Sequence, residues 1–136
     1  MALLNIEDIR IEFPSRRGTL VAVDGVSLSL EKGEILGVVG ESGAGKSTIG
    51  NAVIGLLEAP GRLAGGSVLL NGERIDTLTP AQKRKVRGRR IGMIFQDPLT
   101  SLDPLQTVES QLVETMQVHL NLSHAEAKKR LSLIHI

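Results

Sequence analysis

The stretch EILGVVGESGAGKSTIGNAVIGLL, residues 34–57, decides the fold. Its first six residues, Glu34–Val39, are mostly apolar and are bounded by glycine, which is typical of a strand buried on both faces. After a glycine-rich turn, apolar residues recur at helical spacing over Lys46–Leu57, and Pro60 and Gly61 stop the pattern. The sequence therefore predicts a strand, a glycine-rich turn and a helix, in that order.

The turn between them, GESGAGKST, satisfies the phosphate-loop pattern G-x-x-x-x-G-K-[ST]. Glycines let backbone N–H groups approach anionic oxygens, and the positive end of the following helix points at the same place. In such loops the lysine reaches the β- and γ-phosphates and the hydroxyl ligates Mg²⁺, which are the roles expected of Lys46 and Ser47. The predicted nucleotide-binding residues are Gly40, Glu41, Ser42, Gly43, Ala44, Gly45, Lys46, Ser47 and Thr48.

Chance matches to this pattern are rare, about one in 200 chains of this length at background composition. The alternative is a glycine-rich turn with a solvated lysine, and it leaves the flanking strand and helix patterns unexplained. We therefore expect a nucleoside triphosphate site.

The remaining chain divides into a strand-rich first half and a helical second half. Leu4–Phe13 and Leu20–Leu30 alternate as strands do, with a turn at Pro14–Gly18 and a tight turn at Glu31–Gly33. Downstream, we expect a strand Gly65–Asn71 that ends in an Asn71-Gly72 turn, and a helix that starts at Thr79-Pro80. A buried strand Ile91–Phe95 and a loop Asp97–Pro104 follow. Two helices complete the chain: Thr107–Leu120, with an apolar stripe of Val108, Leu112, Val113 and Met116, and a last helix that begins with a capping box, Ser123–Glu126.

Composition narrows the class of protein. The chain has 136 residues, of which 41% are hydrophobic and 23% charged, so intrinsic disorder is not expected. A net charge of +1 is too balanced for a general polyanion binder, and two aromatic residues are too few for stacking on single-stranded nucleic acid. Cysteine is absent, no apolar run reaches the length of a membrane helix, and the first residues lack the order of a signal peptide. A soluble, cytoplasmic α/β chain is expected.

Longer strings of sequence resemble the nucleotide-binding subunits of ABC transporters. These are AVDGVSLSLEKGE (residues 22–34), the phosphate loop, and MIFQDPLTSLDP (residues 93–104). Together with GRLAGGSV (residues 61–68), the last string is most similar to the peptide importers, the oligopeptide, dipeptide and nickel group. The resemblance covers residues 3 to about 130. It implies an α/β fold in which an antiparallel β subdomain packs on a P-loop core, followed by the start of a helical subdomain.

The resemblance also implies site residues. Gln96 matches a glutamine of the family that is implied to contact Mg²⁺ and the attacking water and to sense the membrane partner. The resemblance therefore implies that Gln96 and Lys46 are the catalytic residues. It also implies that Ser47 and Gln96 are the metal ligands. A neutral amide can coordinate a cation without adding charge. Taken without the resemblance, Gln96 is equally an ordinary exposed glutamine after a strand. Phe13 is the candidate for stacking on adenine, and the alternative is that Phe13 is simply the last inward residue of its strand.

The implied function is an ATP-hydrolysing subunit of an ABC importer, with ATP and Mg²⁺ as cofactors. The implied partners are transmembrane permease subunits, a second ATP-binding subunit arranged head to tail and, indirectly, a substrate-binding protein, at the cytoplasmic face of the membrane and with no nucleic acid. A peptide substrate rests on the subfamily resemblance alone, and nickel stays open. A soluble ABC protein working on nucleic acid would need linked tandem domains.

Several parts of the family's ATPase are missing from this sequence. It has no LSGGQ-type signature, no apolar strand ending in Asp-Glu and no switch histidine; His119, His124 and His135 are interpreted as surface or core residues. For these 136 residues alone, the alternative function is a nucleotide-binding module that binds ATP without turnover.

The tail Leu131–Ile136 (LSLIHI) is expected to depart from the preceding helical pattern. The codons CTG TCT CTT ATA CAC ATC encode these six residues and match a transposon end ligated to fragments in a common sequencing-library preparation. Residues 1–130 are thus interpreted as the N-terminal part of a nucleotide-binding domain and residues 131–136 as translated adapter; a natural apolar tail is the alternative. Sequencing the source DNA across codon 130 tests this, because any other codon set contradicts it.

Residues 83–90 (KRKVRGRR) hold six cations in eight positions. Three interpretations are open: a solvated helix face, contact with a transporter subunit or lipid headgroups, and nucleic-acid binding. The low net charge and the lack of interleaved aromatic residues favour the solvated face.

Overall fold

The computed structural model describes residues 2–97 and 99–134. The chain divides into two compact units, Met1–Arg84 and Lys85–Ile136. The β-sheet and the phosphate loop (residues 40–48) belong to the first unit, and the last two helices of the chain belong to the second. The units are described separately below.

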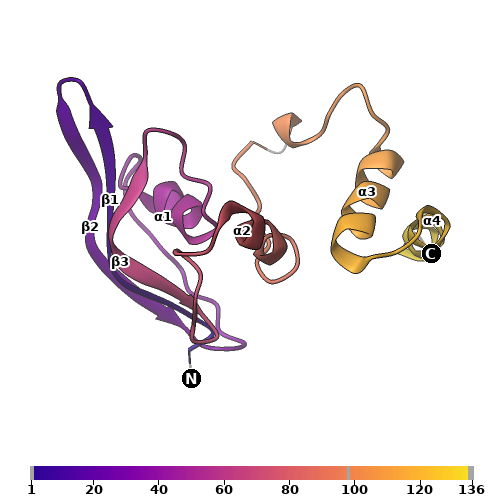
Figure 1. Cartoon of the computed structure of the whole chain (residues 1–136), viewed down its shortest axis with the longest axis horizontal. Coiled ribbons are helices and arrows are strands. Elements are labelled where there is room, and N and C mark those ends of the chain that lie inside the picture. Colours follow the sequence, from indigo (N-terminus) through magenta and orange to yellow (C-terminus); the bar gives the residue numbers. More distant parts are fainter. Residues whose placement is uncertain (1, 98, 135–136) are drawn as a thin grey trace. The chain divides into compact units, whose positions relative to one another are not determined.

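An antiparallel sheet forms the first unit (Figure 1). Its strands are β1 (Leu4–Ser15), β2 (Gly18–Leu30), β3 (Arg62–Leu70) and the short β4 (Glu73–Arg74), in the spatial order β2-β1-β3-β4. The three longer strands lie where the sequence predicts strands, but their bounds differ. The predicted turn Pro14–Gly18 shortens to residues 16–17 because β1 and β2 extend into it, and β3 begins at Arg62 rather than at Gly65. Strand β4, only two residues long, was not predicted because so short a segment carries no periodic signal.

Strand β1 contains an irregularity that sets which of its side chains reach the core. Ile6, Ile9 and Ile11 are all buried, although strict alternation would place Ile6 and Ile9 on opposite faces. The pairing register shifts between Ile6 and Ile9, and Asp8 there adopts a positive φ of 48°. The Asp8 N–H donates to the Ser27 hydroxyl of β2, 2.8 Å away. The register also shifts between Ile9 and Ile11 and between Ile11 and Glu12, so β1 departs from strict alternation at several points and all three isoleucines are buried.

Helix α1 (Lys46–Val53) follows the phosphate loop and packs against β2 and β3, with Ala52 buried. The predicted helix to Leu57 is four residues too long, because the chain leaves helical geometry at Ile54 and Gly55 takes a φ of 67°. Helix α2 (Pro80–Val86) begins where predicted. Its capping residue Thr79 accepts from the N–H of Gln82, whose side chain accepts from the Thr79 N–H in return.

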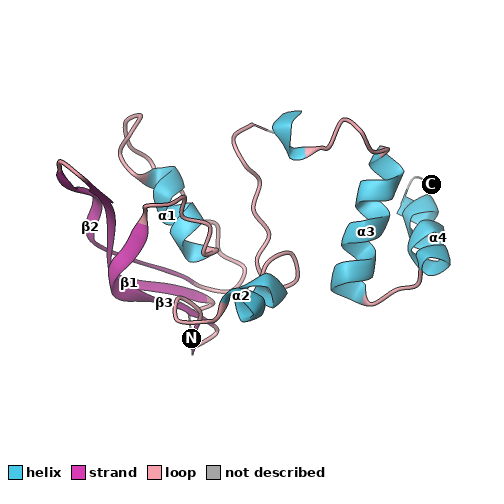
Figure 2. Ribbon diagram, turned by 45° about the horizontal axis from the view of Figure 1, so that its top comes forward, coloured by secondary structure: helices cyan, strands magenta, loops and turns pink. Residues whose placement is uncertain are grey.

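The two segments predicted as buried strands, Glu34–Val39 and Ile91–Phe95, are wrong as predictions of structure. Both are loop in Figure 2, and Ile35, Val39 and Ile94 are at least 95% exposed. The only ladder contact in these runs within the described residues is an isolated bridge between Arg87 and Ile91. Their apolar character was correctly identified, but a strand forms only where another strand bonds to its edge.

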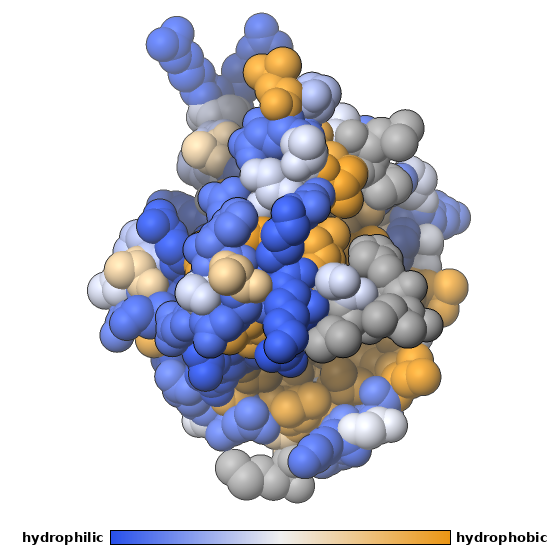
Figure 3. Space-filling model, turned by 90° about the vertical axis from the view of Figure 1, so that its right-hand side faces the viewer, coloured by the Kyte–Doolittle hydropathy of each residue, from blue (hydrophilic) through white to orange (hydrophobic). Residues whose placement is uncertain are grey.

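The second unit is built from a short 3₁₀ turn, η1 (Leu99–Ser101), and two helices, α3 (Val108–Leu120) and α4 (His124–Ile134). Val113, Ala127 and Leu131 form its small core. Of the predicted α3 stripe, Val113 is buried and Met116 packs beside it, whereas Val108 and Leu112 are exposed. Figure 3 shows apolar surface between hydrophilic side chains on the side of the molecule that carries these helices.

Helix starts in this unit agree with the sequence. The hydroxyl of Thr107 accepts from the Ser110 N–H at the start of α3. Ser123 and Glu126 form the predicted capping box of α4. The expected departure from the helix at Leu131 is wrong, since α4 continues to Ile134 and Leu131 is buried against α3. His135, Ile136 and Pro98, which earlier predictions also include, lie outside the described residues.

None of the helices over residues 2–97 and 99–134 has both the length and the apolar character needed to cross a membrane.

A buried carboxylate joins β3 to the chain after β4. The side chain of Asp76 is 8% exposed; its Oδ1 accepts from the Val68 N–H at 3.0 Å, and both its oxygens accept from Arg74 Nε at 3.1 Å. Burial raises the pKa of Asp76, but the bonds from Arg74 and Val68 outweigh it, and the pKa is lowered overall.

We predict that Asp76→Ala lowers the free energy of unfolding by about 1–3 kcal/mol at pH 7, because the Val68 N–H loses its acceptor. Since the folded pKa lies below the unfolded value of about 3.9, the Asp76 contribution is present above pH ~4 and is lost as pH falls through the folded pKa. Urea unfolding at pH 7 and at pH 3 measures both effects. Equal losses at the two pH values would contradict the carboxylate's role.

Candidate nucleotide-binding site

The predicted phosphate loop is an exposed turn that leads directly into α1. Its backbone curls through Gly43 and Gly45, with φ of 84° and 83°, and the Ala44 N–H donates to the Glu41 carbonyl at 3.2 Å. Gly45 occupies the N-cap position, and no side chain caps this end of α1. The N–H groups of the first helical turn have no intrahelical acceptor, so they are free to bind an anion.

Lys46 places its charge at the mouth of this loop. Its Nζ donates to the carbonyl oxygens of Gly40 (2.6 Å) and Glu41 (2.5 Å). The ammonium group therefore lies against the backbone of the loop. Ser47 is exposed on the first turn of α1, and Thr48 is half-buried next to it. These groups fit a polyphosphate: backbone donors, a lysine ammonium group and a hydroxyl able to ligate Mg²⁺.

The position of the loop depends on a close approach between Gly45 and β2. A Cβ at Gly45 would lie 3.0 Å from the Ala22 carbonyl oxygen and 3.1 Å from Val23 Cγ2. A side chain at this position would require β2 to shift by a few tenths of an ångström, in addition to the strain of the positive φ. The second fixed glycine of the motif thus has a packing role besides its role at the phosphate.

Phe13 lies near the end of β1, opposite Leu20 of β2. It is half-buried, and its ring packs on the backbone of Gly61, where a Cβ would be 2.6 Å from Phe13 Cε1. This contact agrees with the interpretation of Phe13 as an inward residue of the strand. Its role in stacking on adenine stays a prediction.

Gln96 belongs to the second unit, whereas the phosphate loop belongs to the first. It is exposed and follows the run Ile91–Phe95 directly. Within the residues that the structure describes, no group of three or more His, Asp or Glu side chains is placed to hold a metal ion. The roles of Ser47 and Gln96 as metal ligands therefore stay predictions.

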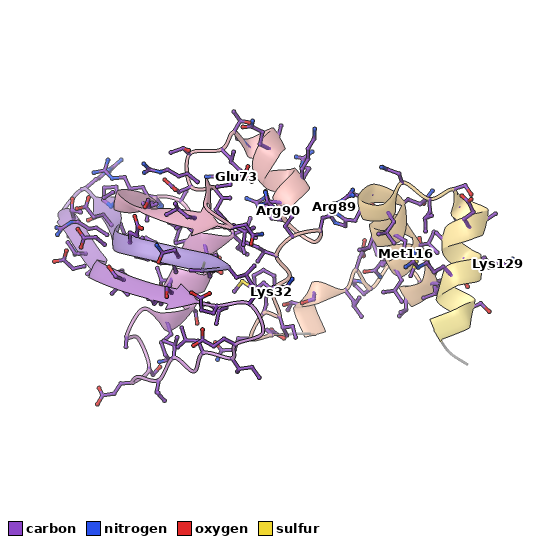
Figure 4. All side chains as sticks on the ribbon, turned by 90° about the horizontal axis from the view of Figure 1, so that it is seen from below. Lys32, Glu73, Arg89, Arg90, Met116 and Lys129 are labelled. Carbon is purple, nitrogen blue, oxygen red and sulfur yellow. The ribbon has the colours of Figure 1, made fainter. Side chains whose placement is uncertain are left out.

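The basic run Lys83–Arg90 is anchored by Val86, which is buried, while Arg84 and Lys85 are exposed. Arg89 extends to α3, where its Nη1 donates to the His119 carbonyl at 3.3 Å (Figure 4). The boundary between the two units falls within the run, after Arg84, and the contact of Arg89 with α3 lies inside the second unit. His119, one of the three histidines, is half-buried beside this turn.

Comparisons with known proteins agree with this fold. A family model described as "ABC transporter" matches residues 23–135. The oligopeptide transport ATP-binding protein OppD of Escherichia coli is 48% identical over 126 residues, covering 93% of this chain and 37% of that protein. The dipeptide transport ATP-binding protein DppD of the same species is 38% identical over 130 residues, covering 96% of this chain and 40% of that protein.

Solved structures give the same result at the level of the fold. The ATP-binding cassette MJ0796 in a dimeric post-hydrolysis state bound to ADP and Pi matches with a TM-score of 0.80 at 24% identity, over 93% of this chain and 53% of that one. A second dimeric structure of this bacterial ABC transporter cassette matches with a TM-score of 0.77.

The sheet, the glycine-rich turn and the helix it opens define a P-loop ATPase fold of the cassette type. The chain belongs to the ABC transporter family, and its curated relatives include ATP-binding proteins of oligopeptide and dipeptide transport. It spans about two fifths of the length of these relatives.

We predict that Gly45→Ala destabilises the nucleotide-free protein more than Gly43→Ala does. Both glycines have φ near 84°, so an alanine costs ~1–2 kcal/mol at either position. A Cβ at Gly43 meets nothing within 4 Å, whereas at Gly45 it meets β2. The extra contact should add about 1–3 kcal/mol, measured by urea unfolding. Equal destabilisation would show that the approach to β2 does not constrain the loop.

Proposed function

We propose that this chain is the N-terminal part of the ATP-binding subunit of an ABC importer that couples binding and hydrolysis of MgATP to peptide uptake. The observation that carries the proposal is the loop Gly40–Thr48, with uncapped N–H groups at the start of α1 and the Lys46 ammonium over the loop. Membership of the ABC transporter family supports it. Peptide is proposed as the substrate because relatives are named for oligopeptide and dipeptide transport.

In this mechanism, the first-turn N–H groups of α1 and Lys46 hold the phosphates. Bound Mg²⁺ would neutralise the charge that develops on the transferred phosphoryl group. Ser47 and Gln96 would hold the metal, and the Gln96 amide would orient the attacking water. Before phosphate binds, Lys46 must release its two carbonyl partners, and it then gains stronger bonds to charged oxygens.

The proposed assembly has two ATP-binding subunits head to tail on permease subunits at the cytoplasmic face of the membrane, with a substrate-binding protein acting indirectly. The dimeric state named for the MJ0796 cassettes supports the pairing. Nickel as cargo has no support among the relatives named above.

The 136 residues alone are proposed to bind ATP without turnover. The reason is that the sequence holds the phosphate loop but neither a signature motif nor an acidic strand end. A steady-state ATPase assay distinguishes this binding module from an active enzyme.

We predict that Lys46→Ala weakens ATP binding by about 10- to 150-fold, because it removes a charged hydrogen bond worth roughly 1.5–3 kcal/mol. Isothermal titration calorimetry with MgATP measures the loss. Lys32→Ala is the matched control, since Lys32 is an exposed lysine in the turn after β2 and the same charge is removed (Figure 4). ATP affinity retained in Lys46→Ala, or lost equally in both variants, refutes the assignment of the site.

A further inference from the structure

A pocket in the first unit lies at the end of α1 that is opposite the phosphate loop. Its volume is about 230 Å³, and its lining comes from the last turn of α1, the start of β3, the chain after β4 and helix α2. Helix α1 is 8 residues long, so its two ends lie about 12 Å apart. The pocket is therefore separate from the phosphate loop, and its lining residues have no role in the proposed function.

The walls of the pocket favour a small ligand with an apolar body. Ala52, Leu57 and Leu63 supply apolar side chains, and Gly55 and Gly61 expose backbone. Pockets for drug-sized molecules usually measure about 300–1,000 Å³, whereas a cavity of about 150 Å³ holds benzene. A molecule that fits this pocket is therefore closer in size to benzene than to a nucleotide.

Three charged side chains complete the lining: Arg62, Asp76 and Lys83. The carboxylate of Asp76 already has its partners, because its oxygens accept from Arg74 and from the Val68 N–H. The charge of Asp76 is thus balanced inside the protein. Asp76 does not make the pocket a site for a cation.

The two cations of the pocket are less completely paired. Lys83 is half-buried in α2, and within residues 2–97 and 99–134 its ammonium group has no hydrogen-bond or ion-pair partner. Arg62 Nη2 donates to Glu12 at 3.2 Å, and the guanidinium carries further N–H donors. A half-buried ammonium group without a counter-ion has lost part of its hydration, and no protein group replaces it. The pocket therefore lacks an anion beside Lys83.

We propose that this pocket binds a carboxylate group on a small apolar body, with the Lys83 ammonium group as its counter-ion. Arg62 adds planar N–H donors, which match the geometry of a carboxylate. Two sources supply such a group: a free monocarboxylate, or an Asp or Glu side chain from the protein beyond residue 136. The second source rests on the proposal that this chain is the N-terminal part of a longer subunit; the first does not.

Benzoate is the probe, and benzamide is its neutral analogue of the same shape. Ligand-observed NMR titrations of the full-length protein that contains this sequence measure both affinities. Benzoate should bind about tenfold or more tightly than benzamide, because only benzoate forms a charged hydrogen bond with Lys83. Saturating MgATP should not displace benzoate, since the phosphate loop lies at the other end of α1.

Two substitutions locate the binding site. Lys83→Met removes the charge and keeps an unbranched side chain of similar helix propensity, so it should weaken benzoate binding by about tenfold or more and leave benzamide binding unchanged. Lys85→Met is the matched control, because Lys85 is an exposed lysine of the same helix outside the pocket. Leu57→Phe fills part of the pocket and should weaken the binding of both compounds.

The two sources of the carboxylate give different results. A free ligand predicts that benzoate binds and that, without ligand, Lys83→Met melts no lower than Lys85→Met. An acidic side chain of the same protein predicts no benzoate binding, and a melting temperature about 2 °C or more lower in Lys83→Met than in Lys85→Met.

Other results overturn the proposal. These are equal affinity for benzoate and benzamide, benzoate affinity retained in Lys83→Met, displacement of benzoate by MgATP, and absent benzoate binding with equal melting temperatures of the two lysine variants. A full-length protein that binds no ATP overturns the proposed function only, and the comparison of benzoate with benzamide still decides whether the pocket binds a carboxylate.

Discussion

The Met1–Arg84 unit depends on β1, which bonds to β2 along one edge and to β3 along the other. Ile6, Ile9 and Ile11 of β1 are all buried, although strict alternation would separate Ile6 from the other two. Shifts in the pairing register along β1, one of them at Asp8, accompany this departure from alternation. Helix α1 packs against β2 and β3, and the sheet that supports α1 includes β1, which pairs with both of these strands. Because α1 begins at the phosphate loop, this sheet also supports the loop.

Much of this fold could be predicted from the sequence, because strands, turns and helix caps are local features. The capping box at Ser123 and the turn at Asn71 require only neighbouring residues, and both form as predicted. The runs Glu34–Val39 and Ile91–Phe95 could not be predicted in the same way. Their apolar pattern records a preference for burial, but strand formation depends on hydrogen-bonding partners distant in sequence, and the described residues supply almost none.

The site, like the fold, combines features that neighbouring residues determine with contacts between residues that are distant in sequence. The phosphate loop has a fixed spacing because glycine conformation, helix start and lysine reach all act within nine residues, so its geometry follows from the motif. The packing of Gly45 on Ala22 is a distant contact and no pattern indicates it. Sequence analysis also missed the pocket that Arg62 and Lys83 line, because its walls come from several elements and no local pattern joins them.

Polar contacts hold the loops that precede α1 and α3, whereas apolar packing holds these two helices. Lys46 closes the phosphate loop through two carbonyl groups, and Gln111 of α3 closes the turn before its helix through three backbone groups of Asp103 and Gln106. A hydrogen bond of this kind contributes only about 0.5–1.5 kcal/mol when both partners are neutral and about 1.5–3 kcal/mol when one is charged, as for Lys46, so these bonds can be exchanged for ligand contacts without unfolding the core. A buried apolar anchor would not permit that exchange. Loops held in this way keep a defined shape and can still exchange their internal bonds for bonds to phosphate.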